Sequence, residues 1–454
     1  MNQTPSTVSW VVVTAMLLAG SNDAAAGQIF TNFSLSESNH PVASALLGRP
    51  ESLETAWSQA LAAAHRLKAS HLGTASARET LAAARASRLP SVSASGGHFS
   101  LDQAPTAVVN LPTLPGLPIV LDDEFWAGQV TTTVPLFTSG QIRSAVGMAK
   151  AGFRAAQAEE RRDTLDLKIG VADAYVQILR VTRAVQVVSS SVASLESHSQ
   201  NVSNLYAEGL VSRNDLLASQ VALADARQRE TQAHNALDLA NANYNRLMVR
   251  SLTNSVVLED LTPPEVSANA TELTARALEE RPELEMFSAQ AEALRKQAKN
   301  IRASALPSVG VSGGYYYLEN SFLERDHAWV VGVVGTWNIF DGGLVRHKAR
   351  AVDDKAEGMS ALREEVADSV ALQVRQAWLD VDETRRRLGV TRDAVEQSEE
   401  NLKVARERYR TGLGTNTEVL DAETFRTRAL SNNDNAIYDA VLASLRLRRA
   451  VGDL

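Results

Sequence analysis

The chain contains 454 residues, of which 44% are hydrophobic and 5% aromatic, and its formal net charge is −8. Long stretches are filled by Ala, Leu, Val, Arg, Glu and Gln, a composition typical of long helices rather than of ordinary globular domains. The sequence contains no basic block, which argues against nucleic acid as a partner. It also contains no Cys, which excludes disulfides, thiolate metal sites and a lipid-modified N-terminal cysteine.

The N-terminus has the features of an export signal, which we assign to residues 1–26. An apolar stretch of 11 residues runs from Trp10 to Gly20, and three alanines precede Gly27 as small residues suited to cleavage. A membrane anchor is the alternative, but this stretch is too short to span a bilayer as a helix, and no later stretch is long and apolar enough. We therefore expect an exported protein that begins near Gly27, with a flexible polar arm at 27–51.

Two copies of one structural plan follow each other along the chain. Leu-Pro-Ser-Val at 89–92 recurs at 306–309, an offset of 217 positions, and both copies run into a Gly-Gly pair. The Tyr-x-x-Gly-Leu motifs that end in Leu210 and Leu413 are offset by 203 positions. An internal duplication of this length predicts a repeated architecture. Its predicted parts are a first repeat at 52–250, a linker at 251–268 and a second repeat at 269–454.

Each repeat is predicted to begin with a helix and two strands. The first helix, about 52–87, ends before Leu89-Pro90 because the residue before a proline is pushed out of the helical region. Period-two alternation of apolar and polar residues then predicts strands, joined in the first copy by a proline-rich loop at 101–122 that holds 14 extra residues. The four predicted strands are 89–99, 125–137, 306–319 and 327–340.

A long helical hairpin completes each repeat. No proline interrupts the stretch from Gln141 to about residue 205, and a helix of that length would extend about 95 Å, too long for a compact domain. Apolar residues step by four and three along it, and the register recurs in the second copy at 344–408, which predicts a coiled-coil seam. Gly209 and Gly412 are expected in the turns, and Asn214 or Asp215 is expected to cap the first returning helix. The returning helices are predicted to end near 248 and 450.

The strands indicate where the protein lies. Each is about as long as a tilted transmembrane β-strand, and aromatic residues lie in or beside them, as in the girdles of an outer-membrane barrel. A soluble four-stranded sheet is the alternative. Four strands cannot close a barrel, and open edges are not tolerated in lipid, so three copies with twelve strands in total form the smallest arrangement with an open lumen. The aromatic residues are Trp126, Trp329, Trp337 and Tyr315 to Tyr317.

The order of these motifs, written twice, resembles the TolC-like outer membrane efflux proteins over about 52–451. Arg281-Pro282-Glu283-Leu284 is similar to the family's Arg-Pro-(Asp/Glu)-Leu signature. The resemblance implies an α+β fold, mostly α: a homotrimeric twelve-stranded β-barrel in the outer membrane lipid, continuous with a long α-helical coiled-coil barrel in the periplasm. It also implies a passive exit duct for efflux or type I secretion, which serves an inner-membrane pump through a periplasmic adaptor. The proline-rich loop would then face the exterior.

The resemblance further implies a gate at the periplasmic tip of the second hairpin. Glu418 and Asp421 are three residues apart and share a helix face, so three copies would surround the axis with carboxylates that attract cations and constrict the pore. Two solvated acids at a helix start, with Thr417 as the cap, are the alternative.

Tyr409 and Asp215 occupy positions at which some family members lock the closed tip. In those members an arginine faces the acid, but Gly414 stands at the corresponding position here, so that ion pair cannot form. Arg213 could substitute for the missing arginine, and Asp215 could act only as a helix cap. The sequence therefore leaves the locking arrangement open.

No grouping of residues predicts catalysis or a bound cofactor. The eight His residues show no spacing suited to a metal site, and no nucleophile motif or phosphate-binding loop occurs. A channel is therefore favoured over a soluble helical enzyme. A periplasmic coiled-coil adaptor or scaffold is the alternative, although adaptors carry one hairpin rather than a duplicated plan. The sequence does not identify the cargo.

Overall fold

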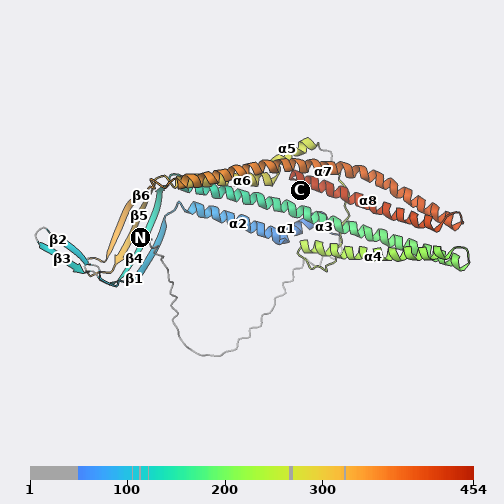
Figure 1. The fold of residues 1–454 in the computed structure, drawn as a ribbon, viewed down its shortest axis with the longest axis horizontal. Helices are drawn as coiled ribbons and strands as arrows, with labels where there is room; N and C mark the ends of the chain where they lie inside the picture. The colour runs from blue at the N-terminus through green and yellow to red at the C-terminus, as the bar shows by residue number, and fades with distance from the viewer. Residues whose placement is uncertain (1–49, 105, 112–113, 121, 265–268, 322–323) are drawn as a thin grey trace, which may run out of the picture. The chain divides into compact units, whose positions relative to one another are not determined.

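The computed structural model describes residues 50–104, 106–111, 114–120, 122–264, 269–321 and 324–454, and Pro50–Leu454 forms one compact unit. The expected signal peptide and nearly all of the expected arm lie outside the described residues. The helices are α1 (Leu53–Ala63), α2 (His65–Ala86), α3 (Gln141–Ala207), α4 (Arg213–Leu247), α5 (Ala270–Glu280), α6 (Pro282–Ala303), α7 (Leu344–Arg410) and α8 (Asn416–Val451), and the strands are β1 (Ser91–Ser100), β2 (Thr106–Leu111), β3 (Leu114–Val120), β4 (Glu124–Phe137), β5 (Ser308–Leu318) and β6 (His327–Thr336), as Figure 1 shows.

The main sheet has four antiparallel strands in the order β1-β4-β5-β6. Its register places Tyr315 of β5 opposite Val130 on one side and Trp329 on the other. All four predicted strands are present, but the fourth ends at Thr336 instead of 340. Its partner β5 begins at Ser308, directly after a proline, which has no backbone N–H to extend the ladder. β1 and β6 form the two edges of the sheet.

The proline-rich segment contains more structure than the predicted loop. β2 and β3 pair with each other as a separate antiparallel hairpin within 106–120, so the prediction of a plain loop at 101–122 was wrong. Pro118 pairs with Val108 in this two-stranded sheet, where each strand has only one hydrogen-bonded neighbour and a proline can be tolerated. The prolines indicated a loop, although β-branched residues such as Val108 and Ile119 favour strands on both sides of the turn.

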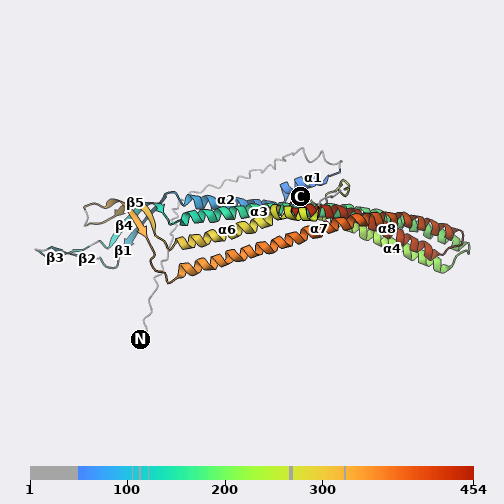
Figure 2. The same ribbon diagram turned by 90° about the horizontal axis from the view of Figure 1, so that it is seen from above.

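The helices next to the sheet lie in the same order as the strands. α2, α3, α6 and α7 are neighbours in that sequence, and they join β1, β4, β5 and β6 respectively (Figure 2). Farther from the sheet, α4 packs on α3, α3 on α8, and α8 on α7. One protomer therefore has one flank made by β1, α2 and α4, and an opposite flank made by β6 and α7.

The first predicted helix, 52–87, is broken in the structure. Ala64 has an extended backbone with φ of −62° and ψ of 121°, which separates α1 from α2. Arg281 adopts nearly the same conformation between α5 and α6. Pro282 disfavours a helical conformation at Arg281, whereas no proline follows Ala64, so the sequence signals the break in only one copy.

The long helices carry the predicted seam. Val171 and Val374, which are equivalent under the offset of 203 positions, are both fully buried. The seam of α3 packs against α1, α4 and α8 at one level and against α4 and Leu420 of α8 nearer the turn, which confirms the coiled-coil prediction. Its buried members are Val171, Ala174, Ile178, Val181, Val192, Leu195, Ser199 and Val202 in α3, and Val370, Val374, Ala377, Thr384, Ser398, Leu402 and Ala405 in α7.

The Arg-Pro-Glu-Leu segment forms a buried polar cluster. The Arg281 guanidinium, which is 5% exposed, donates to the backbone carbonyls of Arg449 and Ala450, each at 3.2 Å. These carbonyls lie at the C-terminus of α8, where a cation complements the helix dipole. Glu283 accepts from Arg281 at 2.9 Å and from Arg449 at 2.9 Å, and Arg449 also pairs with Asp166 of α3 at 2.6 Å. The segment thus ties α6 to α8 and α3.

None of the helices in the described part of the chain has a stretch long and apolar enough to cross a membrane.

Candidate functional site

The two hairpins each end in a glycine turn. Gly209 follows α3 with φ of +77°, and Gly412 follows α7 with φ of +72°, conformations that favour glycine over residues with a Cβ. The backbone N–H of Leu210 bonds back to Leu205, and that of Leu413 bonds back to Arg408. The turns therefore have matching geometry in the two copies, and each leads directly into a returning helix.

The cap of α4 differs from the prediction. Ser212, not Asn214 or Asp215, is the N-cap, because its hydroxyl accepts from the Asp215 N–H at 3.2 Å. The Asp215 carboxylate completes a capping box by accepting from the Ser212 N–H at 3.3 Å and its hydroxyl at 2.7 Å. α8 is capped by Thr415, whose hydroxyl accepts from the Glu418 N–H at 3.2 Å, so Thr417 is not the cap.

Glu418 and Asp421 are both exposed on the first turns of α8. Glu418 forms an ion pair of 3.5 Å with Arg408 at the end of α7, so part of its charge is compensated within the hairpin. Gly414 lies beside this pair, and a Cβ there would meet Arg408 Cβ at 3.0 Å and Glu418 Oε2 at 3.1 Å. An arginine at Gly414 would therefore require this turn to shift. Among the described residues, Asp421 has no ion-pair partner within 4.0 Å.

The candidate lock residues lie near each other but are not hydrogen-bonded. The Tyr409 hydroxyl has no hydrogen-bond partner among the described residues, while the Asp215 carboxylate is engaged in the capping box. Burial, followed by the negative charge of Asp215, raises the pKa of Tyr409. The Tyr409 ring packs edge-on against His198, with centroids 5.3 Å apart. Arg213 forms no ion pair within 4.0 Å in the described part of the chain.

A buried polar link joins the two turns instead. His198 Nε2 lies 2.7 Å from Asn416 Oδ1, and Asn416 Nδ2 donates to the backbone carbonyl of Asp215 at 3.1 Å. His198 is 7% exposed and Asn416 is 3% exposed, so both side chains are shielded from water. We call this His198–Asn416–Asp215 arrangement the tip clamp. It connects α3, α8 and α4, and neither His198 nor Asn416 was predicted from the sequence as a functional residue.

A second buried acid supports the same region. Glu423 of α8 is 3% exposed and pairs with Arg406 at 3.4 Å and with Arg426 at 3.4 Å, and it accepts from the Ser194 hydroxyl. Ser194, Arg406 and Arg426 line an open groove of about 960 Å³ between α3, α7 and α8. Lys403 and Arg410 also line the groove. The lining contains four basic side chains and two acidic ones, Glu399 and Glu407, and His198 is the member of the tip clamp that lines it.

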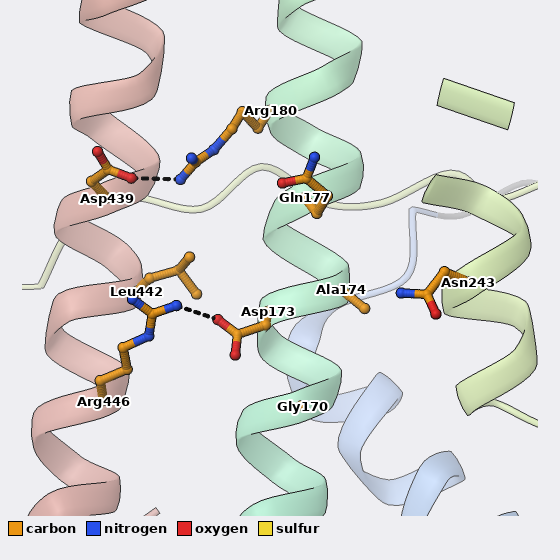
Figure 3. Close-up of a pocket in the computed structure, with 9 residues that line it drawn as sticks. All are labelled: Gly170, Asp173, Ala174, Gln177, Arg180, Asn243, Asp439, Leu442 and Arg446. Atoms are coloured by element: carbon orange, nitrogen blue, oxygen red, sulfur yellow. Dashed lines mark hydrogen bonds and ion pairs between the residues drawn. The ribbon is translucent and has the colours of Figure 1, made fainter. Parts of the chain in front are cut away.

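A second open pocket lies between α3, α4 and α8, well away from the turns. Figure 3 shows two ion pairs across it, between Asp173 and Arg446 at 2.9 Å and between Arg180 and Asp439 at 2.6 Å. Arg387 of α7 also binds Asp439 at 2.5 Å. These ion pairs tie α3 to α8 across the pocket, which has a volume of about 430 Å³. Within the described ranges, no three His, Cys, Asp or Glu side chains are placed to hold a metal ion.

Comparison with known proteins agrees with the resemblance seen in the motifs. A family model described as outer membrane efflux protein matches residues 56–248 and 273–453, more than half of the chain. The chain is 23% identical over 310 residues to the alkaline protease secretion protein AprF of Pseudomonas aeruginosa, a match that covers 65% of this chain and 63% of AprF. It is 24% identical over 328 residues to the outer membrane protein TolC of Vibrio cholerae, and this match covers 69% of this chain and 74% of TolC.

Solved structures show the same fold. The outer-membrane channel OprN superposes with a TM-score of 0.76 at 20% identity, covering 88% of this chain and 90% of OprN. The outer membrane protein VceC from Vibrio cholerae superposes with a TM-score of 0.75 at 18% identity, covering 88% of this chain and 96% of VceC. The α+β, mostly α fold predicted from the repeated motifs is confirmed. The chain therefore belongs to the outer membrane efflux protein family and is an outer-membrane protein.

Proposed function

We propose that the chain forms a homotrimeric exit duct, which passively conducts solutes from an inner-membrane pump and a periplasmic adaptor to the exterior. The observation that carries the proposal is the pair of complementary flanks on one protomer. β1, α2 and α4 form one flank, while β6 and α7 form the other. Joining unlike flanks around a threefold axis would close both the sheet and the helical layer into one twelve-stranded barrel and one helical barrel.

The edge strands support closure in lipid. β1 and β6 each present an unpaired row of backbone N–H and C=O groups, and such groups are costly when they face hydrocarbon. Trp329, Val331 and Val333 alternate on one face of β6, and each is more than 70% exposed in the protomer. An apolar outer face of this kind suits contact with the lipid of a membrane.

The helical flanks support the same assembly. α7 exposes Leu372, Leu379 and Val390 at helical spacing, in addition to its buried seam. α4 exposes Leu217 and Val221 on the opposite flank. A helix with a second apolar stripe buries it against another helix when one is available, so α4 of one copy would pack against α7 of the next.

Within this duct, we assign the gate to Glu418 and Asp421. Both are exposed, share a face of α8 and follow the turn of the second hairpin, so threefold symmetry would repeat them around the axis. The ion pair with Arg408 makes Glu418 the weaker and Asp421 the stronger contributor to a negative field. We propose the tip clamp as a tie between the two turns, in place of a hydrogen bond between Tyr409 and Asp215.

The β2–β3 hairpin would face the exterior, because it lies at the end of the strands away from the helices that follow β4 (Figure 1). AprF is named as a protease secretion protein, and another similar protein, OpmQ of Pseudomonas putida, is named for pyoverdine export. The proposal therefore covers both secretion of polypeptides and efflux of small molecules.

Trimer formation tests the proposal directly. The full chain, extracted from outer membranes in detergent, should have the mass of three copies by light scattering corrected for bound detergent. Val390→Asp, which places a charge on the exposed stripe of α7, should weaken the trimer while the protomer keeps its helical circular dichroism. A stable monomer of the parent protein with full β content and channel activity in planar bilayers would overturn the proposal.

A further inference from the structure

α8 carries a continuous exposed stripe beyond the two gate acids. Successive residues turn by about 100° around a helix, so positions 418, 421, 425, 428 and 432 fall within an arc of about 80°. All five side chains are exposed, and of the residues between them only Thr424 is also exposed, while the others are buried or half-buried. The stripe reads Glu418, Asp421, Phe425, Arg428 and Asn432.

Phe425 is the unexpected member of this stripe, with 51% of its surface exposed. The apolar positions around it are used inside the protomer: Val419 and Ala422 pack against α7, and Leu420 packs toward α3 and α4. α8 itself lies between α7 and α3 rather than on either flank. Neither packing within the chain nor contact between flanks therefore accounts for an exposed phenyl ring at this position.

We propose that Phe425 forms a second, apolar constriction of the duct, directly inside the acidic one. This inference rests on the proposed trimer and gate, because it needs the Glu418–Asp421 face to line the axis. Phe425 is four residues after Asp421, about 6 Å farther along the helix and on the same face. Three copies would then place three phenyl rings around the axis, next to the ring of acids.

An apolar ring of this kind selects by a different principle from a charged ring. Acids attract hydrated cations, whereas a narrow apolar ring disfavours water and therefore opposes hydrated ions of either sign. Entry into the ring costs less free energy for solutes with aromatic or other apolar surface, because these solutes can contact the phenyl rings. Arg428 follows one turn later and reverses the sign of the charge. The stripe thus predicts a duct that favours amphipathic solutes over small hydrated ions.

Because the chain contains no Cys, a single introduced Cys is the only thiol available for cross-linking. Single variants Asp421→Cys, Phe425→Cys and Thr424→Cys are made in the full chain, isolated as trimers and treated with copper phenanthroline or a short bismaleimide. Thr424 is exposed, lies next to Phe425 in sequence and points about 100° away from it around the helix, so it is the matched control. We expect cross-linked protomers with Cys at 421 and 425, and none or far fewer with Cys at 424.

The outcomes separate this inference from the proposed function. Cross-linking at 421 without cross-linking at 425 would overturn the apolar constriction and leave the acidic gate standing. Equal cross-linking at 424 and 425 would also overturn it, since the stripe would then have no preferred direction. If neither 421 nor 425 cross-links in an intact trimer, the face does not line the axis and both ideas fail.

Conductance provides a second readout. In planar bilayers, Phe425→Ala should raise the conductance of small ions several-fold, whereas Phe425→Leu, which keeps an apolar side chain of similar reach, should stay close to the parent. Thr424→Ala is again the control and should have no effect. An unchanged conductance in Phe425→Ala would show that the ring is not a constriction.

Discussion

His198 and Asn416 are joined by a buried hydrogen bond of 2.7 Å between Nε2 and Oδ1. Because the Asn416 amide nitrogen donates to the Asp215 carbonyl, its oxygen faces His198 as an acceptor, and Nε2 of His198 must carry the proton. The link spans the two hairpins, since His198 lies in the C-terminal part of α3, which ends at Ala207, and Asn416 is the first residue of α8. Opening of one hairpin relative to the other would have to break it.

The tip should become less stable at low pH, because protonation would place a charge on the buried ring of His198. Burial, with a further contribution from the charge of Arg406, lowers the pKa of His198 below its usual value near 6.5, while the bond to Asn416 and the charge of Glu423 oppose the shift. A group with a lowered folded pKa contributes stability that is complete above its unfolded pKa and is lost as pH falls toward the folded value. The tip should therefore lose stability as pH drops below about 6.5.

Thermal unfolding of the parent and of His198→Gln, measured between about pH 8 and about pH 5, tests this effect. Glutamine can donate to Asn416 but does not titrate in this range, so the variant should show a flatter pH dependence than the parent. Tyr409, Arg406 and Glu423, which also face His198, are unchanged in both proteins. Identical pH profiles would rule out His198 as the titrating group.

Asn416→Ala should destabilise the tip by about 1–3 kcal/mol, because it removes two hydrogen bonds and leaves the buried Nε2–H of His198 without its acceptor. Hydrogen exchange at the two turns should accelerate more than exchange in the distant sheet. Asn432→Ala, an exposed asparagine on the same helix, is the control and should change stability little. Similar losses in both variants would show that Asn416 acts only through general helix stability.

Glu283→Gln should be strongly destabilising, by about 3–5 kcal/mol, because it removes the carboxylate paired with the buried guanidinium of Arg281 and with the half-buried guanidinium of Arg449. Glu285→Gln is a matched control two residues away, since its ion pair with Arg161 is about half exposed and should contribute at most about 1 kcal/mol. Chemical denaturation of both variants measures the difference. Equal effects would contradict a stabilising role for the buried cluster.

The double variant Glu418→Ala with Asp421→Ala should increase conductance and reduce block by multivalent cations, because both proposed gate carboxylates are gone. Arg408→Ala should increase block by multivalent cations, because it frees the Glu418 carboxylate from its 3.5 Å ion pair. Planar-bilayer recordings with graded cation concentrations distinguish the three proteins. Parent-like block in the double variant would mean that the constriction lies elsewhere.

Deletion of the β2–β3 hairpin should leave trimer formation and export intact. Its strands pair only with each other and not with the four-stranded sheet, so removing 106–120 and closing the gap with a short glycine-serine linker leaves the main ladders unbroken. Asp122 is kept, because its carboxylate accepts from the Ser321 N–H at 2.7 Å. Native gel analysis and an export assay measure the result, and loss of the trimer would contradict an exterior position for the hairpin.

Much of the fold could be predicted from patterns that are local in the sequence. Period-two alternation located the four main strands, and the steps of three and four residues located α3 and α7, because these periods follow from the backbone geometry of a strand and a helix. Gly209 and Gly412 marked the turns because few other residues adopt a positive φ readily. The break at Ala64 and the β2–β3 hairpin were missed, since no proline follows Ala64 and prolines obscured the strands.

The sequence by itself thus determined the repeated elements, the seam and the family. Only the tertiary structure decided which polar groups pair at the tip, because His198 and Asn416 are 218 residues apart and neither belongs to a recognisable motif. The same holds for Arg281, whose carbonyl acceptors on α8 lie 168 and 169 residues away. A hydrogen bond depends on distances of about 3 Å, which arise only when the helices have packed. Periodicity predicts which face of a helix is buried, but not which partner it meets there.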